Sequence, residues 1–299
     1  MNSTMGLSRE SITTFLFLLP LYVFLAIMIG VPVISVFAGS FGIPVFIRLS
    51  PEMKPTLEGY LEFIDPSKPY LESLFFTIKI SAISTAIGVL AGYFFALYLT
   101  IRNPPTWRKV SPVMTIPLFT PYVVGAFMWW TLLFPRGYIA IVINGILMSL
   151  GIIKEPLRLV NDPQGIGIIF GEVWIRFVVA TSIMYSSFQM VRRDLVDAAR
   201  NLGASTWHII RYVYFPLTRY ALIATIATVF LATMIGFSIP FILGGSWPQF
   251  LNVMIYLDIV KRFDYISGYV SGAFYLIVSI LLGYLIFKFM GKKVVVQAR

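Results

Sequence analysis

The chain has 299 residues, of which 58% are hydrophobic, 16% aromatic and only 12% charged, and its mean hydropathy is +0.85. Soluble domains carry about 25% charged residues, and more than half of their surface is already apolar, so they could not bury this much additional apolar area. The composition excludes soluble, secreted and disordered proteins and predicts an integral membrane protein. The net charge of +10 would suggest a nucleic-acid partner only in a soluble chain.

Six stretches are long and apolar enough to cross the bilayer as helices, which takes about 20 residues each. The predicted spans are 12–37, 73–100, 112–134, 166–188, 220–243 and 268–290. Their apolar runs are continuous, whereas a β-barrel would show alternating segments of about ten residues. The first stretch is too long for a signal peptide and has no small-residue cleavage site, so we expect it to be retained. We therefore predict an all-α membrane protein with six transmembrane helices in one domain, 1–299.

The distribution of charge predicts the orientation of these spans. The side that carries both termini has 13 basic and 3 acidic residues, and the opposite side has 8 basic and 9 acidic residues. Lys79, Glu172 and Arg176 fall within spans. Lys and Arg accumulate on the cytoplasmic side of membrane proteins. We expect a multi-pass protein of the plasma or inner membrane with both termini in the cytoplasm.

The loops between the spans differ in character. The outer loop 38–72 contains five prolines, and the inner loop 101–110 is short and basic. The outer segment 138–150 is apolar but too short to span, which predicts an interfacial or re-entrant helix. The inner loop 189–219 has about 30 residues and predicts a helix–turn–helix on the cytoplasmic side.

The pattern within 189–219 supports that helix–turn–helix. Asp194 is a suitable N-cap, Gly203 suits the left-handed residue that ends a helix, and Ser205 or Thr206 can cap a second helix before Pro216. An apolar stripe is formed by Leu195, Ala198, Ala199 and Leu202. Such a small helical pair cannot bury both of its faces, so we expect a partner to dock on it.

The same loop resembles the "EAA" signature of ABC importer permeases, E-A-A, three residues, G, nine residues, then I-x-L-P. This chain has Asp-Ala-Ala at 197–199, Gly203, and Val-Tyr-Phe-Pro at 213–216, so Asp replaces Glu, and Val and Phe replace Ile and Leu. The resemblance covers 73–282. It implies that 189–219, the coupling loop, contacts an ATPase subunit. The residues implied in this coupling are Asp197, Ala198, Ala199, Gly203, Ala204, Val213 and Pro216.

The resemblance also implies the partners. They are a second permease subunit, two ATPase subunits that bind ATP and Mg²⁺, an extracytoplasmic solute-binding protein and the lipid bilayer, with no nucleic acid. The segments 80–99, 155–160 and 237–245 are similar to polyamine-type permeases, and 130–134 with Asn144 is similar to sugar permeases. The solute is therefore a polyamine-type compound or a sugar or polyol. The alternative is a secondary transporter or channel driven by an ion gradient, which would need buried carboxylates beyond Glu172.

Helix breaks and polar side chains within the spans indicate a solute path between the third, fourth and fifth spans. Proline and glycine free backbone groups there, which is tolerated only beside protein or a water-filled cavity. Glu172 and Arg176 share one face of the fourth span and are either a packed ion pair or part of the path. Trp129 and Trp130 are either interface anchors or solute contacts. The candidate path residues are Glu172, Trp174, Arg176, Trp130, Pro121, Gly236 and Pro240.

The sequence lacks the motifs of metal-binding, catalytic and ATP-binding sites. There is no cysteine and one histidine, His208, which excludes thiolate metal sites and a Ser-His-Asp triad. No G-x-x-x-x-G-K-[ST] phosphate loop occurs, so ATP must bind elsewhere. We expect no catalytic residue, metal or cofactor in this chain.

Overall fold

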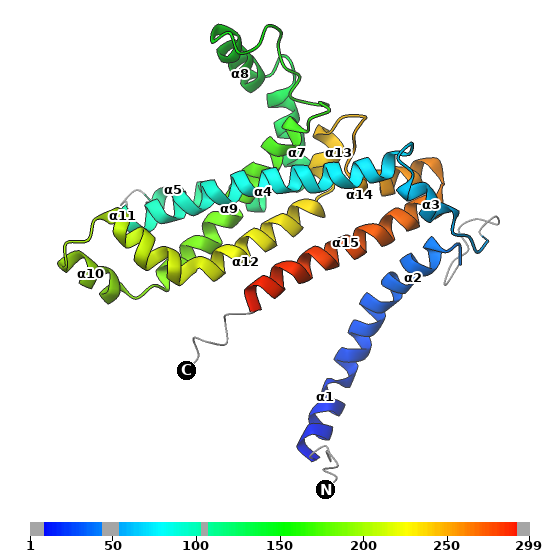
Figure 1. Ribbon diagram of the computed structural model, residues 1–299, viewed down its shortest axis with the longest axis horizontal. Coiled ribbons are helices and arrows are strands. Elements are labelled where there is room, and N and C mark those ends of the chain that lie inside the picture. The colour runs from blue at the N-terminus through cyan, green and yellow to red at the C-terminus, as the bar shows by residue number, and fades with distance from the viewer. Residues whose placement is uncertain (1–8, 44–53, 103–106, 292–299) are drawn as a thin grey trace. The chain divides into compact units, whose positions relative to one another are not determined.

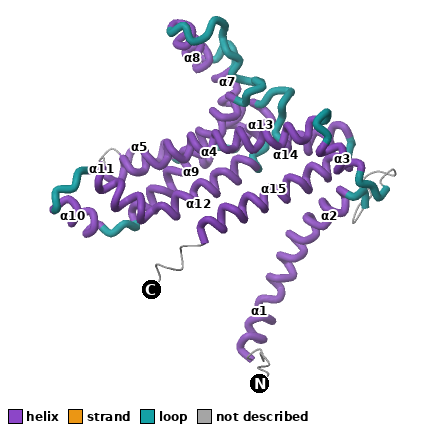
Figure 2. The backbone as a smooth tube through the Cα atoms, in the orientation of Figure 1, coloured by secondary structure: helices purple, strands orange, loops and turns teal. Residues whose placement is uncertain are grey.

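The computed structural model describes residues 9–43, 54–102 and 107–291, and these are almost entirely helical (Figures 1 and 2). Within these ranges β-structure is limited to one isolated parallel bridge between Asp162 and Gly244. The predicted all-α class is confirmed. The chain divides into two compact units, Met1–Lys68 with Ile255–Phe274, and Pro69–Met254 with Tyr275–Arg299. The single domain predicted over 1–299, with its core at 73–282, stays a prediction.

The first unit contains the first span. Helix α1 (Arg9–Leu25) continues through a π-helical turn (Ala26–Gly30) into α2 (Val31–Ser40), as predicted for 12–37. Short helix α3 (Glu58–Ile64) follows in the long loop, where the hydroxyls of Ser40 and Tyr60 lie 2.6 Å apart. The ring of Phe63 stacks on Phe274 with centroids 3.9 Å apart. These contacts make α2, α3 and the start of the last span one packed unit.

The second unit is built on three long helices that lie side by side, α4 (Pro69–Arg102), α9 (Ile166–Gln189) and α12 (Phe215–Met234) (Figure 1). Glycines on α4 allow the close approach of α9, as is common between membrane helices. A Cβ at Gly92 would lie 2.7 Å from the Cβ of Ala180, and one at Gly88 would lie 3.0 Å from that of Arg176. The predicted second and fourth spans are thus confirmed as one tightly packed pair.

The third predicted span, 112–134, is broken, as its prolines predicted. It consists of α5 (Trp107–Met114), α6 (Ile116–Phe119) and α7 (Tyr122–Leu133). Thr120 is extended, with ψ 125°, a conformation that the following Pro121 favours because its ring disfavours the helical region for the residue before it. Helix α8 (Tyr138–Ser149) follows α7 at a bend of 42°, and the two together are long enough for a broken span or a re-entrant loop.

The fifth predicted span, 220–243, is wrong at its start, and it is broken where Gly236 predicted. One helical run covers Thr206–Met234, from α11 (Thr206–Ile209) through a π-helical turn (Ile210–Tyr214) into α12. A proline ring clashes with the i−4 carbonyl of an α-helix, and the wider π-turn directly before Pro216 relieves that clash. The run ends at Met234, and α13 (Ser238–Leu243) follows the break.

The remaining helices are α10 (Arg193–Asn201) in the coupling loop, α14 (Leu251–Tyr256) with a π-helical turn at Leu257–Arg262, and α15 (Tyr265–Gly291). In the described part of the chain, five helices are long and apolar enough to cross a membrane, or six if α7 and α8 form one bent span.

Candidate functional site

The coupling loop forms the predicted helix–turn–helix at one end of the three-helix bundle (Figure 1). Helix α10 ends in a Schellman motif, in which the amide of Gly203 donates to Arg200 O (2.9 Å) and that of Ala204 to Ala199 O (3.0 Å). Gly203 has φ +80°, the left-handed conformation predicted for it. The next helix begins after Ser205, whose hydroxyl accepts from the amide of His208. Both ends of this turn are therefore fixed by local hydrogen bonds.

The N-cap expected for α10 is corrected. The N-cap is Arg192, not Asp194, and its side chain makes no cap hydrogen bond. Asp194 instead accepts from Arg192 Nε at 3.1 Å, which lowers the pKa of the Asp194 carboxyl. On the apolar stripe, Leu195 and Leu202 are 44% and 88% exposed, so these leucines do not face the bundle.

A different row of side chains attaches the coupling loop to the bundle. Val196, Ile209 and Tyr214 are buried in one cluster with residues of α4 and α9. The Phe188 ring lies edge-on to Tyr214, with centroids 5.6 Å apart, and to Tyr93, at 5.3 Å. Burial of this row leaves the leucine face of α10 open for a partner.

The face of the coupling loop away from the bundle carries an open groove of about 340 Å³, lined by both of its helices and including Leu202, Gly203, His208 and Tyr212. Of the residues implied in ATPase coupling, Ala199, Gly203, Ala204 and Val213 line it, whereas Asp197 lines a second pocket beside Arg200 and Tyr214. Asp197, Ala198 and Gly203 are exposed, and Ala199, Ala204, Val213 and Pro216 are half-buried. Asp197 Oδ1 lies 3.9 Å from Arg200 Nη1, an exposed pair that leaves the carboxylate accessible.

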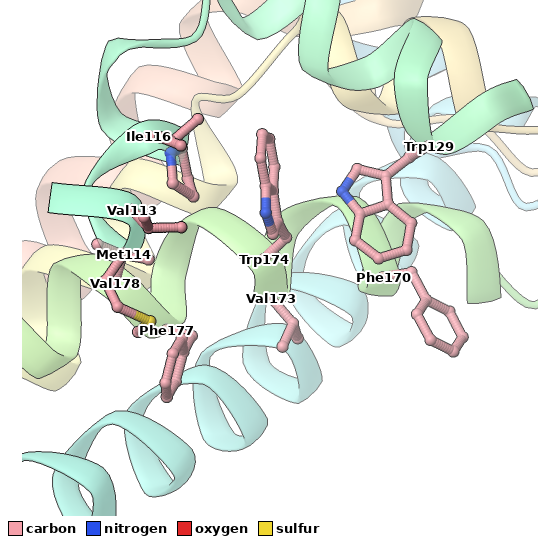
Figure 3. A pocket seen from close by; sticks show the side chains of 10 residues that line it. Val113, Met114, Ile116, Trp129, Phe170, Val173, Trp174, Phe177 and Val178 are labelled. Carbon is pink, nitrogen blue, oxygen red and sulfur yellow. The ribbon is translucent and has the colours of Figure 1, made fainter. Parts of the chain in front are cut away.

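An aromatic cavity that is open to the surface lies between the third and fourth spans, in the region of the predicted solute path. It has a volume of about 490 Å³, and the aromatic residues that line it are Phe170, Trp129, Trp174 and Phe177 (Figure 3). The Trp129 ring lies 6.3 Å from Trp174, edge to face, and 5.9 Å from Phe170. Trp129 Nε1 is buried and has no hydrogen-bond partner among the described residues. The cavity is therefore lined by apolar side chains, with the indole N–H groups of Trp129 and Trp174 as the polar atoms among them.

The two adjacent tryptophans have different environments. Trp130 packs on Phe134, with centroids 4.8 Å apart, and does not line the aromatic cavity. Trp129 belongs to the cavity, and the roles of the two tryptophans as interface anchors or solute contacts stay predictions. Helix α7 reaches α9 here because Gly125 has no side chain, since a Cβ would lie 2.8 Å from Trp174. No sequence pattern links Trp129 to Trp174.

Glu172 and Arg176 form a buried ion pair on the opposite face of α9. Arg176 donates to Glu172 Oε2 from Nε at 2.9 Å, and Nη2 lies 2.8 Å from the same oxygen. The side chains are only 3% and 1% exposed, respectively, and neither lines the aromatic cavity. Trp174 lines the cavity although Glu172 and Arg176 do not, because residues two apart on a helix point to opposite sides.

The predicted helix breaks are present. Pro121 is exposed and precedes α7, Gly236 is half-buried between α12 and α13, and Pro240 is buried in α13. A Cβ at Gly236 would lie 3.0 Å from Glu172 Oε1, so the break packs directly on the ion pair. A search of the described ranges finds no group of three His, Cys, Asp or Glu that could hold a metal ion.

Comparison with known proteins also indicates a transport permease. Residues 84–296 match the model of the family "binding-protein-dependent transport system inner membrane component". The chain is 28% identical over 217 residues to the spermidine/putrescine transport system permease protein PotB of Escherichia coli, covering 71% of this chain and 74% of that protein. It is 26% identical over 243 residues to the trehalose/maltose permease protein MalF of Thermococcus litoralis, covering 80% and 79%.

Solved structures agree in fold. A chain of a bacterial ABC transporter that imports alginate superposes with a TM-score of 0.72 at 17% identity, covering 96% of this chain and 97% of that one. A chain of the MetNI methionine ABC transporter superposes with a TM-score of 0.57 at 16% identity, covering 74% and 94%. The chain therefore belongs to the binding-protein-dependent transport system inner membrane components, the multi-pass permease subunits of ABC importers.

Proposed function

We propose that this chain forms half of the solute path of an ATP-driven importer, and that its coupling loop docks on an ATPase subunit in the cytoplasm. The observation that carries this proposal is the two-sided coupling loop. One side is buried against α4 and α9, while the other exposes Leu202, Trp207 and Tyr212 at 88%, 62% and 66%. A large exposed apolar face outside the bilayer indicates a protein partner.

The helix that leaves the coupling loop can transmit the motion of that partner. The run Thr206–Met234 has 29 residues without interruption. At 1.5 Å per residue it is about 43 Å long, enough to cross the bilayer. ATP and Mg²⁺ bind the ATPase subunits in this scheme, and a second permease subunit and a solute-binding protein complete the path. This chain then converts movement of the coupling loop into opening and closing around the solute.

The aromatic cavity is the proposed solute contact, and it favours two classes of small organic solute. A polyamine-type solute is supported by the likeness to PotB and by the aromatic faces, which attract cations. A sugar or polyol is supported by the free Nε1 donor of Trp129, because a buried donor gains most from a ligand that offers an acceptor. Glu172 and Arg176 neutralise each other and favour neither class.

The docking of the ATPase is tested by a charge on the exposed face of α10. In Leu202→Asp we expect the ATPase no longer to co-purify with the permease, because the carboxylate would be desolvated at the interface. Leu61→Asp is the matched control, since Leu61 is 64% exposed on α3, outside the coupling loop. Co-purification of the ATPase with Leu202→Asp at the wild-type level would contradict the proposal.

The solute class is tested with the complete transporter in proteoliposomes. We expect ATP-dependent uptake of labelled spermidine and putrescine, or of labelled maltose and glucose, when the matching binding protein is added. Uptake without ATP that an ionophore abolishes would instead indicate a transporter driven by an ion gradient.

A further inference from the structure

We propose that Arg176 is a latch that fixes the far end of α12 to α9, with Glu172 holding the guanidinium in place. Arg176 is then a positioning residue of the transport cycle and does not contact solute. The inference goes beyond the proposed function, because it names the point at which motion of the coupling loop is passed on.

The end of α12 is held by hydrogen bonds from other helices. The last carbonyls of a helix have no partner within it, and at membrane depth water cannot replace one. Arg176 Nη2 donates to Ala232 O at 2.8 Å, and the Tyr275 hydroxyl donates to Met234 O. Asn252 Nδ2 donates to Gly236 O at 2.6 Å. Side chains from three other helices therefore hold this broken end.

Two glycines make room for the Arg176–Glu172 ion pair. Gly88 on α4 leaves room for the base of the Arg176 side chain, and Gly236 leaves room for the Glu172 carboxylate, since a Cβ at either position would lie 3.0 Å from these groups. Each charge at the centre of a membrane helix is costly, and Glu172 neutralises Arg176. A planar guanidinium can donate to Glu172 and to Ala232 together, which one ammonium point charge does less well.

The coupling loop connects α9 to the helix that carries Ala232, the hydrogen-bond partner of Arg176. Helix α9 enters the coupling loop and the helix Thr206–Met234 leaves it, so the two form a hairpin along the bundle (Figure 1). The Arg176–Ala232 hydrogen bond joins the hairpin again at its other end. Beyond it the chain turns into α13, which packs on α7 and α9. A displacement of the coupling loop therefore moves the turn at 235–237 only if α12 does not slide along α9.

The experiment compares three variants in the complete transporter. Glu172→Gln/Arg176→Met removes the latch without leaving an unpaired charge, and Arg176→Lys keeps the ion pair, so that at least one variant assembles. Thr233→Val is the matched control. Thr233 is fully buried near the same helix end, and its hydroxyl bonds only to Val229 O of its own helix.

We expect the solute transported per ATP hydrolysed to fall about tenfold in the double variant and less in Arg176→Lys, with the KM for solute unchanged. Thr233→Val should retain the wild-type ratio. A changed KM or solute selectivity with the ratio intact would overturn the latch and place the pair in the solute path. A wild-type ratio in both latch variants would also overturn it.

A second measurement does not depend on transport. Spin labels on Thr228→Cys in α12 and Phe241→Cys in α13, both exposed positions of a cysteine-free chain, report the distance across the break. We expect a narrow distance distribution in the parent and in Thr233→Val, and a broader one in both latch variants. Equal widths in all four proteins would refute the latch even if the permease function holds.

Discussion

Replacing Gly203 tests whether the turn of the coupling loop sets the efficiency of transport. Gly203 has φ +80°, and a Cβ added there would meet no atom within 4 Å. Steric clash therefore contributes nothing, and the effect of a side chain is limited to backbone strain. A left-handed L-residue costs about 1–2 kcal/mol, with asparagine at the low end and valine at the high end.

That cost corresponds to a change of about 5- to 30-fold in the population of the native turn. We expect solute uptake per ATP to fall within that range in Gly203→Val, and less in Gly203→Asn. The strain would open the Schellman motif and distort the groove beside Leu202 and His208. Uptake and ATP hydrolysis are measured together in proteoliposomes, after assembly has been checked by co-purification of the ATPase.

Gly151 provides a matched control for this strain. It ends α8 in the same motif, with its amide donating to Met148 O and that of Ile152 to Leu147 O, both at 3.0 Å. Its φ is +68°, and a Cβ would again meet nothing within 4 Å. Gly151→Val should therefore carry the same strain outside the coupling loop and leave uptake per ATP unchanged. Unchanged uptake in an assembled Gly203→Val transporter, or equal loss in Gly151→Val, would refute the reasoning.

Three further predictions concern topology, solute and stability. A membrane-impermeant maleimide should label Ser67→Cys in spheroplasts and Ser205→Cys only after permeabilisation, and labelling of both in intact spheroplasts would contradict the orientation. If the solute is a sugar, Trp129→Phe should raise its KM about tenfold by removing the free Nε1 donor, while Trp130→Phe should not; an equal effect of both would exclude a direct hydrogen bond. Asp162→Ala should lower the stability by about 1 kcal/mol, because its carboxylate accepts from two amides at the start of α9; an unchanged melting temperature in detergent would count against this.

The sequence determined the features that depend on composition and on local chemistry. Continuous apolar runs were sufficient to identify the spans at 12–37, 73–100 and 166–188, because each must hydrogen-bond its own backbone in lipid. Gly203 and Ser205 defined the turn of the coupling loop, since the left-handed residue and the N-cap each act within a few residues. The family resemblance rested on this same local signature.

Helix boundaries were less well determined, for a physical reason. Hydropathy places the start of the fifth span at Tyr220, after the last arginine, whereas the helix begins at Thr206. Charged side chains end the apolar run without interrupting backbone hydrogen bonds. In the third predicted span the prolines do interrupt the helix, and Pro121 marked the break at Thr120 in the sequence.

Only the tertiary structure decided which side chains meet. Helix α10 has two apolar rows, and the pocket formed by Tyr93 and Phe188 selects Val196 for burial and leaves Leu202 exposed. Arg176 meets the carbonyl of Ala232, 56 residues away. No helical period encodes such a contact, because it depends on where α12 ends and on how closely Gly88 lets α4 approach α9. Sequence periodicity determines the faces of single helices, whereas the crossing of three helices determines the latch and the aromatic cavity.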